Sequence, residues 1–169
     1  MKRFVLAGLV LAVLPLAGMF LMPGTSTPTA EAHCEVPCGI FADQRRFEQM
    51  LEDTATIRKA MVQIGELAGK GDAQSQNQLV RWVNTKEDHA KHIQHTIAQY
   101  FMAQRIKTSQ ATYVDRLKTS HAVMQAAMKS KQTVDVAAAD KLKASILAFH
   151  KVYEPNAGKK GAEHGHDHK

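Results

Sequence analysis

Three residues near the start of the chain, His33, Cys34 and Cys38, carry donor atoms suited to a metal ion. They follow Ala30-Glu31-Ala32, a small-x-small signal-peptidase site, so cleavage after Ala32 would make His33 the first residue of the mature protein. The free α-amine, the Cys34 amide nitrogen and the Cys34 thiolate could then form two adjacent chelate rings, and Cys38 could add a second thiolate. Two nitrogens and two sulfurs in a plane, with the His33 imidazole available axially, favour Ni(II) or Cu(II) over tetrahedral zinc.

The spacing of the two cysteines also allows a simpler interpretation. Cys-x3-Cys is a weak signal when it is taken without the cleavage site, and Cys34 and Cys38 could form a small disulfide loop in an exported protein. The sequence is therefore also compatible with two proteins that are not enzymes. One is a nickel or copper binding protein, and the other is a structural helical bundle with a disulfide.

Residues 1–32 have the organisation of a cleaved signal peptide. Met1-Lys2-Arg3 is positively charged, residues 4–22 form an apolar run, and residues 23–32 are a spacer that ends at the cleavage site. The apolar run is long enough for an uncleaved membrane anchor, but Pro15 and Gly18 within it and the cleavage motif after it favour removal. We expect a mature protein that is exported, either periplasmic or secreted, and that has no membrane association after cleavage.

Segment 33–41, His-Cys-Glu-Val-Pro-Cys-Gly-Ile-Phe, resembles the metal-binding N-terminal segment of nickel-type superoxide dismutases, called here the nickel hook. Stretches 77–83 and 99–102 are also similar to longer-chain members, so the resemblance covers about 31–154. It implies a nickel ion held by His33, Cys34 and Cys38, a Ni(II)/Ni(III) cycle that converts superoxide to dioxygen and hydrogen peroxide, and a homohexamer of four-helix bundles. How the ion reaches the protein is open, and a nickel-delivery factor would be a further partner.

The same resemblance implies roles for residues around the metal. Glu48 matches the family carboxylate that hydrogen-bonds the axial imidazole, and Lys86 and Arg81 are candidates for its basic partner. Phe41 stands where the family usually has a tyrosine that orders water above the metal, which puts substrate gating in question. The backbone N–H groups of Glu35 and Val36 could order a water molecule in its place.

The rest of the chain must supply the scaffold. Hydrophobic residues make up 44% of the chain and aromatic residues only 6%, which is typical of an all-helical protein. Apolar residues recur at spacings of three and four over about 43–68, 75–106, 111–130 and 134–153. Residues 42–154 are therefore predicted to form an antiparallel up-down four-helix bundle, with Asp43 as the first N-cap. The buried stripe of the third helix is predicted to consist of Tyr113, Val114, Leu117, His121, Met124 and Met128.

The remaining histidines and charges suggest weaker sites. His89, His92 and His95 recur every third residue, but no matching Glu-x-x-His pair exists for a di-iron bundle, so we expect them to face solvent or another subunit. The tail 155–169 carries His164, His166 and His168 and lacks a hydrophobic core, which predicts a disordered, metal-collecting segment. The net charge of +6 is spread along the helices, and with the export signal it argues against nucleic acid.

Overall fold

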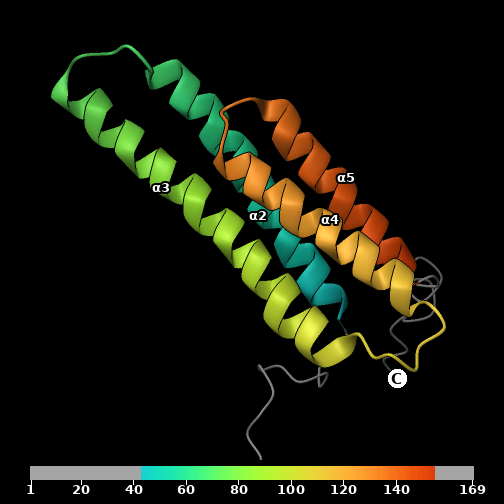
Figure 1. Cartoon of the computed structure of the whole chain (residues 1–169). Helices are drawn as coiled ribbons and strands as arrows, with labels where there is room; N and C mark the ends of the chain where they lie inside the picture. Colours follow the sequence, from blue (N-terminus) through green and yellow to red (C-terminus); the bar gives the residue numbers. More distant parts are fainter. Residues whose placement is uncertain (1–42, 155–169) are drawn as a thin grey trace, which may run out of the picture. The chain divides into compact units, whose positions relative to one another are not determined.

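The structure, a computed structural model, describes residues 43–154 and consists of helices in that range (Figure 1). The elements are α2 (Gln44–Leu67), α3 (Ala73–His95), the π-helix η1 (Thr96–Arg105), α4 (Tyr113–Lys131) and α5 (Val136–Tyr153). The predicted signal peptide, the nickel hook and the His-rich tail all lie outside the described residues. Within the described range, no helix is long and apolar enough to cross a membrane.

The helices pack as the predicted up-down bundle. Helix α2 lies against α3 and α5, and α4 lies against α5 and α3 (Figure 1). Successive helices run in opposite directions, so the start of α2, the end of η1, the start of α4 and the end of α5 meet at one end of the bundle. The all-α prediction is confirmed, and it places the attachment point of segment 33–41 at this end, because residue 43 is where that segment joins α2.

Short loops with specific turn chemistry connect the helices. The predicted end of the first helix at Gly69 is confirmed, and this glycine has φ of 85°, a backbone conformation that disfavours side chains with a Cβ. Asp72 then caps α3 by accepting a hydrogen bond from the Ser75 amide at 2.9 Å. Asp135 caps α5 in the same way with the Ala137 amide at 3.0 Å.

The core contains the predicted stripes of three helices. Its large, fully buried side chains come mainly from α2, the second helical segment and α5: Phe47, Met50, Ile57, Met61, Ile93, Ile97, Tyr100, Phe101, Leu142, Ile146 and Phe149. The stripe of the third helix is confirmed only in part: Tyr113, Leu117 and Met124 pack against the core, whereas Val114, His121 and Met128 are exposed. The buried residues of α4 are instead small: Ser120, Val123, Ala126, Ala127 and Ser130. Small side chains let α4 pack closely against its neighbours, and they are weak signals in a hydrophobicity pattern.

The second helix is not continuous α-helix as predicted. Its last ten residues, Thr96–Arg105, form the π-helix η1, which ends with a hydrogen bond of 2.9 Å from the Ile106 amide to the Phe101 carbonyl, five residues back. Bonding over five residues brings side chains five positions apart close to the same face, whereas an α-helix would separate them. Tyr100 and Arg105 are such a pair, and both point to the start of α2.

Candidate metal centre and its supporting residues

The predicted ligands His33, Cys34 and Cys38, and with them Glu35, Val36 and Phe41, precede the described residues. Across residues 43–154, no group of three or more His, Cys, Asp or Glu side chains is arranged to hold a metal ion. The structure does describe the residues to which the hook is joined. These begin at Asp43, five positions after Cys38.

Asp43 occupies the N-cap position of α2, as predicted, but its side chain does not cap the helix. The carboxylate turns into the bundle, and only 6% of the residue is exposed. Its Oδ2 accepts hydrogen bonds from the Tyr153 hydroxyl at 2.7 Å and from Arg105 Nη2 at 2.8 Å and Nε at 3.2 Å. Its Oδ1 accepts a hydrogen bond from the Tyr100 hydroxyl. We call Asp43, Tyr100, Arg105 and Tyr153 the Asp43 network; it joins α2, η1 and α5.

The Asp43 network keeps its carboxylate ionised. Burial by itself would raise the pKa of Asp43, but the hydrogen bonds from Tyr100, Tyr153 and Arg105 and the Arg105 charge outweigh burial and hold this pKa below 3.8. The tyrosines shift in the other direction. Burial and the bond to the negative carboxylate raise the pKa of Tyr100 from 10.0 to about 12, and the same causes raise the pKa of Tyr153. The hydrogen bond to Asp43 likewise raises the pKa of Arg105.

Aromatic rings support the network from below. Phe47, one helical turn after Asp43, has its ring centroid 5.0 Å from Phe101, 5.3 Å from Phe149 and 5.6 Å from Tyr153. The Arg116 guanidinium lies 4.5 Å above the Tyr153 ring and donates a hydrogen bond of 2.9 Å to the Tyr153 carbonyl. The first turn of α2 is therefore held by buried polar and aromatic contacts rather than by a capping hydrogen bond.

Glu48 lies on the exposed side of α2 and accepts a hydrogen bond from Gln44 Nε2 at 3.1 Å. It lines a surface hollow with Arg45, Gln49 and Glu52. The suggested basic partners lie elsewhere in the fold. Arg81 is exposed on α3, and Lys86 donates hydrogen bonds to carbonyls at the end of α4. Arg45 is the basic residue that lines the same hollow as Glu48. It lies three residues before Glu48 on α2, a spacing at which helical side chains are neighbours, and the sequence alone shows this spacing.

Lys86, a candidate basic partner of Glu48 in the sequence, is 4% exposed and has other partners. Its ammonium group donates to the Ser130 carbonyl at 3.2 Å and to the Lys131 carbonyl, and it pairs with Glu87 Oε1 at 3.1 Å. These carbonyls belong to the last turn of α4, where backbone acceptors lack helical partners and a cation is favourable. Lys86 thus joins α3 to the end of α4.

The histidines of α3 make contacts that the sequence did not predict. His89 Nδ1 lies 2.6 Å from Asp53 Oδ1, and His92 Nδ1 lies 2.6 Å from Asp53 Oδ2. Both imidazoles are 37% exposed, so they partly face solvent as expected, but Asp53 is buried and ties them to α2. The signal was the pair of polar residues Asp53 and Thr54 inside the apolar stripe of the first helix.

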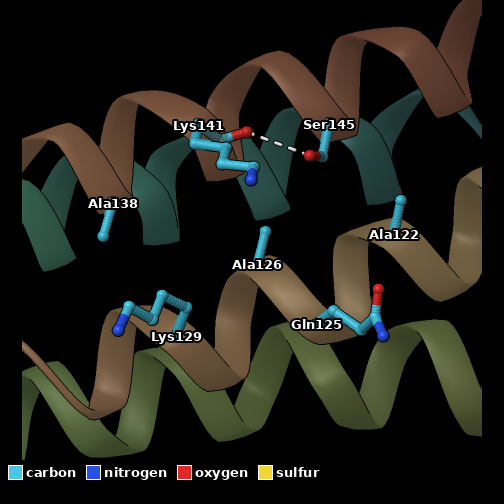
Figure 2. Close-up of a pocket in the computed structure, with 7 residues that line it drawn as sticks. All are labelled: Ala122, Gln125, Ala126, Lys129, Ala138, Lys141 and Ser145. Atoms are coloured by element: carbon cyan, nitrogen blue, oxygen red, sulfur yellow. Dashed lines mark hydrogen bonds between the residues drawn. The ribbon is translucent and has the colours of Figure 1, made fainter.

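A groove lies between α4 and α5 (Figure 2). Its lining is Ala122, Gln125, Ala126, Lys129, Ala138, Lys141 and Ser145. Ser145 is turned along α5, where its hydroxyl donates to the Lys141 carbonyl at 3.0 Å. The lining holds small side chains, a glutamine and two lysines but no His, Cys, Asp or Glu, so this groove has no features of a metal centre.

One of the comparisons with known proteins identifies a family for the chain. No curated protein and no solved structure matches the chain. The family model described as nickel-containing superoxide dismutase matches residues 28–156, which is most of the chain and includes all of segment 33–41 and the bundle. The chain therefore belongs to the nickel-containing superoxide dismutase family, and it is an oxidoreductase that uses nickel and acts on superoxide.

Proposed function

We propose that the mature chain begins at His33 and dismutates superoxide at a nickel ion held by His33, Cys34 and Cys38. The observation that carries this proposal is the sequence Ala-Glu-Ala-His-Cys, in which the cleavage site frees the amine of the residue next to a cysteine. In the precursor, the His33 nitrogen is an amide and has no lone pair available for a metal. Cleavage would thus create the site as well as release the protein.

The donor set suits nickel chemically. The amine and the deprotonated Cys34 amide would supply two nitrogens, Cys34 and Cys38 two thiolates, and His33 an axial imidazole, a combination that favours a square-planar or tetragonal ion. A nickel ion held by these residues would supply the one-electron redox chemistry of the Ni(III)/Ni(II) couple, which aqueous nickel does not supply at a suitable potential. Strong donation from thiolates and an ionised amide lowers that potential. The overall reaction takes two superoxide anions and two protons to one dioxygen and one hydrogen peroxide.

The surrounding residues have supporting roles in this proposal. Glu48 would accept a hydrogen bond from the His33 imidazole and hold the ring for axial binding, as second-shell carboxylates do for metal-bound histidines. Support comes from its position: it is exposed and lies about 7.5 Å along the helix axis from Asp43, where the hook is attached. Phe41 would shape the substrate pocket without a hydroxyl, and the Glu35 and Val36 amides would order water there.

Export and assembly complete the proposal. Removal of residues 1–32 would place the mature enzyme in the periplasm or outside the cell, and the family resemblance suggests a homohexamer. Light scattering of the mature protein gives its mass, and a mass six times that of the chain is expected; a monomer would contradict the hexamer. N-terminal sequencing of the same sample is expected to read His-Cys-Glu.

The deciding experiment measures nickel and activity together. The mature protein is expected to contain about one nickel per chain, and it should accelerate superoxide decay when the reaction is followed by pulse radiolysis or stopped flow. Metal-free protein is the matched control and should be inactive. One nickel per chain with no acceleration would contradict the enzyme and favour the non-enzymatic binding protein. Cysteines that cannot be titrated in the metal-free, unreduced protein would favour the structural disulfide.

A further inference from the structure

We propose that Asp43 is a positioning residue for the metal-binding segment, acting through Arg105, Tyr153 and Tyr100 to fix where the chain leaves the bundle. This inference rests on the proposed function, because it concerns the same nickel ligands. It goes beyond that function by assigning a role to four residues of the bundle, none of which is proposed to touch the metal.

Asp43 stands at the N-cap position of α2, but its side chain does not cap the helix. An aspartate at an N-cap usually accepts a hydrogen bond from an amide of the first turn and thereby stabilises the helix. The Asp43 side chain makes no such bond and is turned inward, where it binds two hydroxyls and a guanidinium. The carboxylate cannot face both ways. Its position therefore favours holding the chain at residue 43 over capping the helix.

A buried charge network defines geometry better than it adds stability. Replacing a buried ion pair with well-packed apolar residues often leaves stability unchanged or improves it, so such a network is a poor way to gain stability. It is a good way to define one geometry, because four donor atoms around one carboxylate restrict its position and orientation. Asp43 is fixed in this way from η1 and from α5, two elements far away in the sequence.

The π-helix η1 brings two of the partners of Asp43 together. An α-helix would place Tyr100 and Arg105 on different sides, and η1 brings both to Asp43. The π-helix is rare and is frequently found at functional sites. In this protein, η1 ends beside the residue that joins the bundle to the hook.

The connection between Asp43 and the proposed ligand Cys38 is short. Cys38 is five residues before Asp43, and an extended chain of that length spans at most about 18 Å. Four residues, 39–42, separate Cys38 from Asp43, so the position of residue 43 limits the volume in which the Cys38 thiolate can lie. A metal centre loses function when its ligands are displaced by about 1 Å, so a fixed attachment point matters to it.

The test compares Asp43→Asn with Asp53→Asn in the nickel-loaded mature protein. Both variants neutralise a buried carboxylate of α2 that bonds another helix, but Asp53 lies about 15 Å farther along the helix axis. The measurement is the rate at which nickel is lost to an excess of a strong chelator, followed with the unfolding midpoint. We expect Asp43→Asn to lose nickel at least tenfold faster than the parent, and Asp53→Asn to lose it within twofold of the parent rate. Equal nickel loss in the two variants at equal loss of stability would show that Asp43 is only structural.

A second variant and a metal-free measurement complete the test. Tyr153→Phe removes one hydroxyl donor and leaves the ring in the aromatic cluster, so it remains informative if Asp43→Asn does not fold; about threefold faster nickel loss is expected, and an unchanged rate would overturn the proposal. In metal-free protein, hydrogen exchange of the amides at 44–47 should be faster in Asp43→Asn than in Asp53→Asn. If the parent binds no nickel, the proposed function fails, whereas unchanged exchange at 44–47 overturns the anchoring by Asp43 itself.

Discussion

The Tyr153 hydroxyl donates a hydrogen bond of 2.7 Å to Asp43 Oδ2, and this bond joins the last residue of α5 to the residue that precedes α2. The two residues are 110 positions apart in the sequence. The contact closes the bundle at one end and ties the final turn of α5 to the residue at which the described chain continues from the nickel hook. It also makes the stability of that end measurable by single substitutions.

Removing this hydroxyl should destabilise the protein. Tyr153→Phe leaves an ionised, buried Asp43 with one donor fewer, and a hydrogen bond to a charged group contributes about 1.5–3 kcal/mol. Urea unfolding followed by circular dichroism should show a loss of that size in the free energy of unfolding. Tyr113→Phe is the control, because Tyr113 is half-buried at the start of α4 and lies outside the Asp43 network. Equal losses in the two variants would contradict the account.

Alkaline pH should weaken the bundle through the same network. The pKa of Tyr100 is raised from 10.0 in the unfolded chain to about 12 in the fold, because burial and the Asp43 carboxylate disfavour the phenolate. A raised pKa means that the contribution to stability is fully present below pH 10 and is lost as the pH rises toward 12. The free energy of unfolding should fall over that interval.

The check is a urea titration at several pH values together with the near-ultraviolet absorbance of phenolate. In Tyr100→Phe, the part of the phenolate signal that appears near pH 12 should disappear, and the fall in stability above pH 10 should become smaller. A Tyr100→Phe protein with the same alkaline profile as the parent would assign the pH dependence to other groups.

The proposed ligands should separate into two kinds. Cys34→Ser and Cys38→Ser each remove a thiolate that sets the redox potential, so both should abolish dismutation. His33→Gln keeps the amine and the amide nitrogen but lacks the axial imidazole, so Ni(II) should be retained while turnover falls steeply. Nickel content by mass spectrometry and superoxide decay should be measured on the same samples. Parent-level activity in His33→Gln would rule out the axial role.

The amine itself can be tested by extending the chain. A mature protein with one extra residue before His33, or a precursor in which Ala32→Leu blocks cleavage, has an amide in place of the α-amine. Helicity should be unchanged, because α2 begins at Gln44, well after the extension, but nickel affinity and dismutase activity should collapse. Full activity in the extended protein would exclude the amine as a ligand and leave only the side chains.

Restoring the family's hydroxyl at position 41 should affect the reaction without affecting the metal. Phe41 contributes no ligand atom, so Phe41→Tyr should leave nickel content unchanged and alter only turnover or resistance to peroxide. Phe41→Leu is the control for the ring. A change of several-fold in nickel occupancy on Phe41→Tyr would mean that residue 41 shapes the ligand geometry directly.

The sequence alone determined the helical class and the residue types of the proposed metal centre. Spacings of three and four predicted α2 and α5 because large apolar side chains on one face of a helix must be buried together. The resemblance to the family was visible at His33, Cys34, Pro37 and Cys38, which are close neighbours in the chain, and the family model that matches residues 28–156 confirms the family. Local patterns of this kind can be recognised without knowing where distant segments lie.

Only the tertiary structure decided what the buried polar residues do. Asp43 has the sequence signature of a helix cap, yet Tyr153 and Arg105, brought to it by α5 and η1, bind its carboxylate instead. In the sequence, Asp53 and Lys86 only interrupt apolar stripes. In the structure, Asp53 contacts His89 and His92, and Lys86 binds a carbonyl at the end of α4. The change from α-helix to π-helix at Thr96 was likewise not predicted from the apolar spacing. A polar side chain can bond locally or across the core, and only the packing of helices far apart in the sequence decides between the two.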